Sequence, residues 1–269
     1  MLRTTGLAAA AILLAAAAPA SGGWRALDPE NTLVIDTTKG RIVVELRPDF
    51  APKGVERIKL LAREGVYDGL LFHRVIDGFV DQTGNPDNHD GGASTHPDLP
   101  PEFTFRIPPE TAAIVVERSD AREGFVGATP FQAVSAAEQA RASDGRLRGW
   151  GAYCAGVMGM GRQADPGSAN SEIFFMREPA RRLDHDYTVT GRVVVGLEVA
   201  RAVAIGEPPV AADRMIRVRV AADLPEAERP VVEVEDEKSA GFRSKVAAQK
   251  QAKGPAFSIC DVELRSRIR

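Results

Sequence analysis

The sequence predicts a mainly β protein built on a closed antiparallel sheet. Apolar and polar side chains alternate in residues 32–47, which is typical of strands with one buried face. Short strand signals then recur along the chain, at residues 70–82, 156–160, 172–176 and 189–195. Only two segments of this part of the chain, 52–65 and 197–204, have the spacing of amphipathic helices. Because a sheet of many short strands exposes its edges unless it closes on itself, we expect a barrel.

Turn and capping residues predict the first elements. A turn at residues 37–40 divides the alternating segment into the two strands of a hairpin. Pro52 suits the first position of a helix, where no backbone N–H is needed, and Gly65 suits the helix end. The apolar residues between them share one helical face: Val55, Ile58, Leu61 and Ala62.

Length, charge and cysteine content exclude several classes of protein. The chain has 269 residues, with 34 basic and 37 acidic side chains and a formal net charge of −3. A chain so close to neutral is not built for a phosphate backbone, so we expect no nucleic-acid partner. Two cysteines exclude a disulfide-dense scaffold. Cys154 and Cys260 are predicted either to form one disulfide in an oxidising compartment or to remain two thiols.

The first 20 residues have the three parts of a secretory signal peptide. Arg3 makes the start basic, residues 7–18 contain only Leu, Ile and Ala, and Ala18-Pro19-Ala20 is a small-x-small cleavage motif. The apolar run is too short to cross a bilayer of about 30 Å, which disfavours the alternative of an uncleaved anchor. We therefore expect cleavage near Ala20-Ser21, a periplasmic or secreted location, and no membrane association of the mature protein.

Two parts of the chain lie outside the predicted barrel. The strand pattern lapses at 106–149, and this segment is predicted to be an inserted lobe containing one helix. After a strand at 215–220, the charges of residues 233–253 are interpreted as the solvated face of a helix. Residues 256–264 alternate weakly and are predicted to add an edge strand. The predicted organisation is a signal peptide at 1–20, a barrel domain at 30–206 that carries the insertion, and a C-terminal extension at 207–269.

The residues that carry chemistry concentrate in residues 72–86, which read FHRVIDGFVDQTGNP. This segment resembles the cyclophilin-type peptidyl-prolyl cis-trans isomerases, whose hallmark is F-H-R-x-x-x-G-F-x-x-Q-x-G, and every fixed position of that pattern is present. A second region is similar to the same family, with GVMGMG at 156–161, NSEIFF at 170–175, LD at 183–184 and YTVTGRV at 187–193. The resemblance covers about residues 32–103 and 156–203.

The resemblance implies an eight-stranded barrel with a helix at each end and a shallow pocket on the barrel wall where a proline ring docks. It implies that Arg74 is the catalytic cation and that Gln82 is a hydrogen-bonding partner. Phe79 and Phe174 would form apolar walls close to the reacting bond. The further substrate-binding positions that it implies are Val80, Gly161, Arg162, Glu172, Leu183 and Tyr187.

The implied reaction needs neither a nucleophile nor a cofactor. Resonance opposes rotation about a peptide C–N bond with a barrier of about 18–20 kcal/mol, and an X–Pro bond crosses it in tens to hundreds of seconds. An apolar pocket and a placed cationic donor favour the twisted amide over the planar one. We therefore expect no cofactor and no metal. His89, His96 and His185 lack paired ligand spacing, and His73 is interpreted as a structural residue because no proton is transferred.

The leading hypothesis is an isomerase that accelerates rotation about X–Pro bonds while exported proteins fold, with proline-containing segments of unfolded or partly folded proteins as partners. Glu172 stands where the family usually has Gln, and it places a negative charge beside the substrate backbone. Ile173 and Arg182 also depart from the family pattern. These departures and the insertion keep open a catalytically weak or inactive proline-peptide-binding or chaperone module of the cell envelope, and a structural envelope protein that reuses the barrel.

Overall fold

The alternating residues 32–47 form the predicted hairpin. β2 (Thr32–Thr37) and β3 (Gly40–Leu46) pair antiparallel, with Leu33 opposite Val44 and Ile35 opposite Ile42. These four side chains are fully buried in one apolar core, as the alternation predicts. The structure is a computed structural model that describes residues 22–269, so the predicted signal peptide lies outside the described residues.

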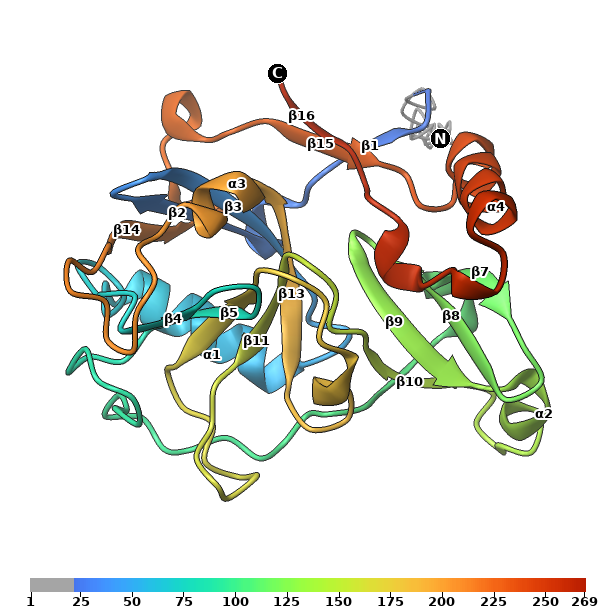
Figure 1. Cartoon of the computed structure of the whole chain (residues 1–269), viewed down its shortest axis with the longest axis horizontal. Coiled ribbons are helices and arrows are strands. Elements are labelled where there is room, and N and C mark those ends of the chain that lie inside the picture. The colour runs from blue at the N-terminus through green and yellow to red at the C-terminus, as the bar shows by residue number, and fades with distance from the viewer. Residues whose placement is uncertain (1–21) are drawn as a thin grey trace, which may run out of the picture.

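The hairpin belongs to an antiparallel sheet of eight strands that curls around this core (Figure 1). In spatial order the strands are β14 (Met215–Val220), β2, β3, β13 (Val189–Val195), β11 (Val157–Met160), β12 (Ile173–Met176), β5 (Val80–Thr83) and β4 (Arg74–Ile76). Residues 69–72, which precede β4, exchange a few backbone hydrogen bonds with residues 213–215, where β14 begins. The mainly β class is confirmed, and the closure of the sheet depends on these few bonds between its edges.

The strand β14 lies beyond residue 206, where the sequence predicts the barrel domain to end. It pairs with β2 through five registered positions and buries Met215, Val218 and Val220 in the barrel core. The eighth strand therefore comes from the segment that sequence patterning assigns to the extension.

Two helices pack against the barrel, as predicted. α1 (Pro52–Arg63) begins at a proline and buries Val55, Ile58 and Leu61 in the barrel core. Gly65 follows its end with a φ of +71°, a left-handed conformation that glycine adopts without strain. The second helix, α3 (Leu197–Arg201), is shorter than the predicted span 197–204 and contacts β3.

The insertion, predicted as a lobe with one helix, is mainly a second antiparallel sheet. In spatial order its strands are β6 (Phe105–Ile107), β10 (Leu147–Gly151), β9 (Thr129–Val134), β8 (Ala121–Val126) and β7 (Ala113–Glu117). The predicted helix is the single turn α2 (Ala136–Gln139), which Ser135 caps. The ring of Phe105 stacks on Phe50 at 4.1 Å between centroids, and this contact joins the insertion to the segment before α1.

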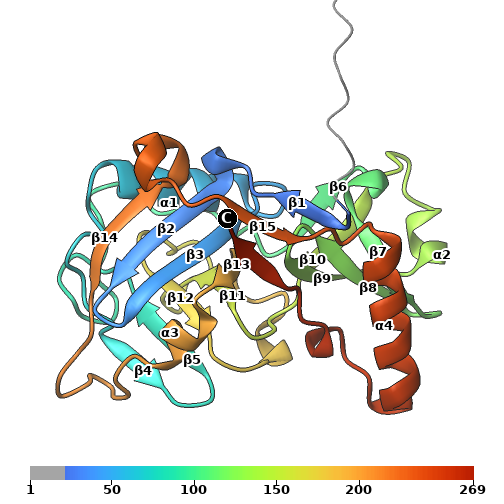
Figure 2. The same cartoon turned by 90° about the horizontal axis from the view of Figure 1, so that it is seen from above.

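The C-terminal extension ties the two ends of the described chain together. β15 (Val232–Glu235) pairs with β1 (Trp24–Ala26) on one side and with β16 (Ser266–Ile268) on the other (Figure 2). The prediction of a solvated helix over 233–253 is therefore wrong for its first residues, because Glu233 and Glu235 are buried by arginine and lysine partners. The edge strand predicted at 256–264 is also wrong, since these residues form 3-10 turns, one of them capped by Ser258.

The rest of the extension packs against the insertion. α4 (Ala240–Lys253) lies beside β7 and β8 (Figure 2). It places Phe242 edge-on against Phe125 of β8, with ring centroids 5.4 Å apart. Cys154 and Cys260, left open by the sequence, form a disulfide with a Cα–Cα distance of 5.0 Å. One apolar cluster thus joins the extension, the insertion and the outer wall of the barrel.

Among residues 22–269, no helix combines the length and the apolar character needed to span a bilayer.

Candidate active site

All ten residues that the family resemblance implies line a single pocket on the barrel wall, with a volume of about 240 Å³. They are Arg74, Phe79, Val80, Gln82, Gly161, Arg162, Glu172, Phe174, Leu183 and Tyr187. Asp90 also lines it, and sequence reasoning did not identify this residue. Residues 106–149 contribute nothing to the lining of this pocket within the described chain, so the insertion does not cover it.

Neighbouring strands bring the central residues together. Arg74 of β4 lies opposite Gln82 of β5, and Gln82 lies opposite Phe174 of β12. Directly opposed residues point to the same face of a sheet, so these three side chains form one row. Phe174 in turn lies opposite Gly159, where a Cβ atom would come within 2.6 Å of the phenylalanine ring. The glycine therefore leaves the space in which the ring lies.

Arg74 is held by two side chains at the rim of the pocket. Its Nε donates to Glu207 Oε2 at 2.7 Å, and its Nη1 donates to Gln82 Oε1. The Arg74 side chain is 31% exposed and that of Glu207 is 53% exposed, so this ion pair is accessible to solvent. The remaining N–H groups of the guanidinium have no side-chain or backbone acceptor among the described residues. They can therefore donate to a bound carbonyl or amide.

Glu172 fixes the orientation of the Gln82 amide. The Gln82 Nε2 donates to Glu172 Oε1 at 2.6 Å, and the Asn85 Nδ2 donates to Glu172 Oε2 at 2.6 Å. An ionised carboxylate can only accept hydrogen bonds, so Gln82 must present its amide nitrogen to Glu172 and its oxygen to Arg74. Gly161 makes room for this carboxylate, since a Cβ there would lie 1.9 Å from Glu172 Oε1.

The Glu172 carboxylate is ionised at neutral pH although it is buried. Burial by itself would raise the pKa of this carboxyl, but interactions with His73, Asn85 and Gln82 outweigh burial and lower the pKa below its usual value. The site therefore carries a fixed negative charge beside Gln82, where the family pattern has a neutral amide. The guanidinium, the amide and the carboxylate form a chain of hydrogen bonds with one defined polarity.

The opposite side of the pocket is apolar. Val80 and Phe174 are buried, and Phe79 and Leu183 are partly buried around them. Tyr187 meets the Phe174 ring edge-on, with centroids 5.8 Å apart. The pocket thus combines the cationic donor Arg74 with walls that suit a compact apolar ring.

Arg162 closes one side of the pocket above Tyr187. Its guanidinium carbon lies 4.6 Å from the centroid of the Tyr187 ring, and its Nη2 donates to Asp186 Oδ1 at 2.6 Å. Only 11% of the Arg162 side chain is exposed, so its aliphatic part packs against the wall.

The insertion supports the pocket from behind. Leu183 ends the 3-10 helix Arg181–Leu183, whose first residue reaches into the insertion. The Arg181 side chain donates to Glu123 Oε1 at 3.2 Å and to Gln132 Oε1 at 2.6 Å. These contacts anchor the segment that carries Leu183.

Sequence reasoning missed three residues at the rim. Glu207 is 133 positions from Arg74, and no local pattern connects them. Asp90 lies in a loop with ordinary turn composition. Arg182, which was seen only as a departure from the family, lies over the Phe79 ring at 4.4 Å. Only the barrel topology brings these side chains to the pocket.

The arrangement suits catalysis without covalent chemistry. A proline ring held among the apolar walls would keep one side of the X–Pro bond in place. The free guanidinium donors would then bind the amide as it twists and loses its double-bond character. Such a site could stabilise a rotating amide without proton transfer.

Comparisons with known proteins agree with this geometry. Residues 32–220 match the family model described as "Cyclophilin type peptidyl-prolyl cis-trans isomerase/CLD". A probable peptidyl-prolyl cis-trans isomerase of Brucella suis is 35% identical over 192 residues, which cover 67% of this chain and 75% of the relative. A peptidyl-prolyl cis-trans isomerase of Schizosaccharomyces pombe, ppi1, is 31% identical over 172 residues, 64% of this chain and 83% of the relative.

A solved structure is similar over nearly the whole chain. The cyclophilin AquaCyp293 from Hirschia baltica superposes with a TM-score of 0.83 and 31% sequence identity. The match covers 91% of this chain and 93% of the other. It therefore extends well beyond the residues that match the family model.

Proposed function

The chain belongs to the cyclophilin-type peptidyl-prolyl cis-trans isomerase family, and we propose that it isomerises X–Pro bonds in the pocket formed by Arg74, Gln82, Phe79 and Phe174. The observation that carries this proposal is the Arg74 guanidinium, held by Gln82 and Glu207 at the rim of a cavity whose opposite side is apolar. Proline-containing segments of polypeptides are the substrates.

The proposed roles follow from the contacts. Phe79, Phe174, Val80 and Leu183 hold the proline ring, and Arg74 binds the twisted amide more tightly than the planar one. Only this difference in binding lowers the barrier, because equal binding of both states would change affinity alone. Gln82 positions Arg74 through its amide oxygen.

The experiment is a protease-coupled isomerase assay on a proline-containing tetrapeptide, comparing the wild type with Arg74→Ala. A charge-assisted hydrogen bond contributes about 1.5–3 kcal/mol, so kcat/KM should fall by about 10- to 150-fold. Arg41→Ala is the matched control, because Arg41 forms an exposed ion pair with Asp36 outside the pocket. The control should keep the wild-type rate.

Two outcomes would overturn this assignment. If Arg74→Ala keeps the wild-type kcat/KM, Arg74 is not the catalytic cation. If the wild type binds proline peptides but gives no rate above background, the alternative of a peptide-binding module is favoured. Glu172 is the observation that keeps this alternative in view, since its charge lies where the family has a neutral amide.

We further propose that the enzyme acts on exported proteins outside the cytoplasm. Residues 1–20 support this proposal by their signal-like composition. The Cys154–Cys260 disulfide supports it independently, because such bonds persist in oxidising compartments and are rare in the cytosol. The mature protein would begin near Ser21.

A further inference from the structure

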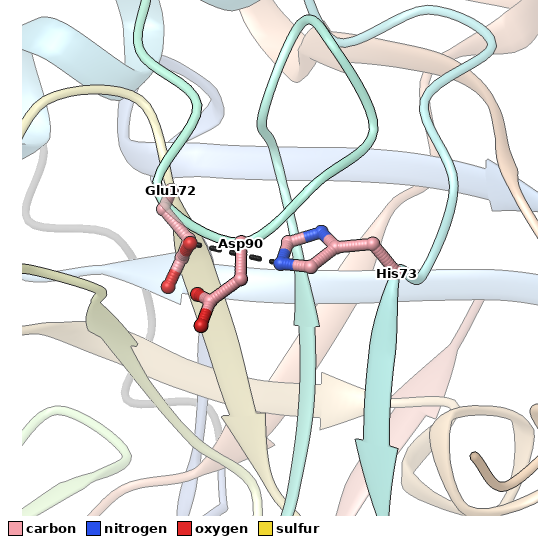
Figure 3. Close-up of side chains that lie close together, drawn as sticks. All are labelled: His73, Asp90 and Glu172. Carbon is pink, nitrogen blue, oxygen red and sulfur yellow. Dashed lines mark ion pairs between the residues drawn. The ribbon is translucent and has the colours of Figure 1, made fainter. Parts of the chain in front are cut away.

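A histidine and two carboxylates converge beside the pocket (Figure 3). His73, Asp90 and Glu172 each offer one ligand atom, and these three atoms lie within 4.8 Å of one another. His73 immediately precedes β4, Glu172 immediately precedes β12, and Asp90 lies in the loop that follows β5. Residues from three separate segments therefore meet at one point.

His73 is buried without a partner. Its side chain is 2% exposed, and neither ring nitrogen has a hydrogen-bond partner among the described residues. The Nε2 atom lies 3.6 Å from Glu172 Oε2. Figure 3 shows the His73 ring directed toward this carboxylate. A buried polar group without a partner is costly, and most such groups in proteins are satisfied. The unpaired ring nitrogen aimed at a carboxylate therefore indicates a ligand held between them.

We propose that His73, Asp90 and Glu172 bind one divalent first-row transition ion, of which Zn²⁺ fits best. Imidazole and carboxylate are ligands of Zn²⁺, with bonds of about 2.0–2.2 Å. In a tetrahedral site such bonds place neighbouring ligand atoms about 3.4 Å apart, close to the 3.6 Å between His73 and Glu172. The two positive charges of such an ion would balance the two negative charges of the Asp90 and Glu172 carboxylates.

The surroundings of Glu172 suit a metal ligand. Gln82 and Asn85 donate to its two oxygens at 2.6 Å each, which fixes the direction of the carboxylate. Metal-bound carboxylates are commonly oriented by such hydrogen bonds. Asp90 is exposed, so its carboxylate can close on the ion. A cavity of about 230 Å³, lined by both His73 and Asp90, provides a route of entry.

The site does not depend on the isomerase activity, so it is tested by binding alone. The untagged protein is titrated with Zn²⁺ by calorimetry and with Co²⁺ by visible absorption, whose bands report four-coordination. Thiolates do not compete within residues 22–269, because both cysteines are in the disulfide. We expect one ion per chain.

The variants separate this site from adventitious binding. Loss of groups that merely orient a ligand weakens metal affinity by about 10- to 100-fold, so Asp90→Asn and Glu172→Gln should each weaken Zn²⁺ binding at least about 10-fold. Asp87→Asn and His89→Gln are the matched controls, because both residues lie exposed in the same loop but outside the cluster. Their affinities should stay within about twofold of the wild type.

The proposal is overturned in three cases: if the wild type shows no saturable binding, if Asp90→Asn and Glu172→Gln both keep the wild-type affinity, or if His89→Gln abolishes binding. In the first case the cluster is only a contact between His73 and Glu172. The thermal unfolding midpoint of each variant shows whether it folds. Glu172 is buried, so if Glu172→Gln disturbs folding, the affinity of Asp90→Asn alone decides the test.

Discussion

The disulfide between Cys154 and Cys260 should contribute several kcal/mol to the free energy of unfolding. Cys154 is fully buried behind the pocket wall, and Cys260 lies 106 positions later in the C-terminal extension. The bond keeps these two parts of the chain together when the protein unfolds. Replacing Cys260 by Ala removes this constraint and leaves the folded contacts of the buried partner in place.

The magnitude follows from the length of the closed loop. In the chain-entropy description, a loop of about 100 residues corresponds to about 4.7 kcal/mol at 25 °C, and measured effects are commonly about 2–5 kcal/mol. For an m-value of about 3 kcal/mol per M of urea, this loss lowers the unfolding midpoint by about 0.7–1.7 M.

The assay is urea unfolding followed by circular dichroism, on the oxidised wild type, the reduced wild type and Cys260→Ala. The double variant Cys154→Ala/Cys260→Ala is the control, because its difference from Cys260→Ala isolates the packing of the buried thiol. Equal midpoints for the oxidised wild type and Cys260→Ala would refute the loop-closure reasoning. A loss seen only in the double variant would assign the effect to packing.

Two further predictions concern pH and export. Burial raises the pKa of Asp81 to about 6 despite its 2.7 Å ion pair with Arg177. Between about pH 4 and 6 the folded protein then binds more protons than the unfolded chain, so this group lowers stability as pH rises. The unfolding free energy of the wild type relative to Asp81→Asn should fall by about 1–3 kcal/mol across this range, and a constant difference contradicts the assignment. Mass spectrometry of protein from the periplasmic fraction should give an N-terminus near Ser21, whereas protein that keeps Met1 in the cytoplasm contradicts export.

The barrel elements were predictable where the periodicity of apolar side chains and the turn or capping residues indicate the same element. The hairpin at 32–47 and the helix that begins at Pro52 have strong local signals, and both form as expected. The insertion lacks such signals. In β8 the alternation is broken by Gly124, whose absent side chain lets the neighbouring strand approach, since a Cβ there would lie 2.2 Å from the Ala113 oxygen. The buried Glu123 in the same strand is satisfied by arginines that sequence cannot place.

In the pocket too, residues with a local sequence signal were predictable and residues without one were not. Arg74, Gln82 and Phe174 come from motifs, and strand pairing places them in one row. Glu207 and Asp90 come from loops, and their place at the rim depends on the path of the whole barrel. A charged residue in a loop gives no signal of which distant partner it will meet.

The strand β1 has a consequence for how the molecule is made. Trp24 lies opposite Glu235 across the small terminal sheet, about 210 positions later in the chain, and such distant pairings form slowly. On the ribosome the segment 24–26 emerges well before its partner strand, which is translated about 210 residues later. The nascent chain therefore carries an unsatisfied strand edge while the intervening residues are made, which exposes it to wrong partners. An enzyme of protein folding would thus complete its own assembly only when β15 joins β1.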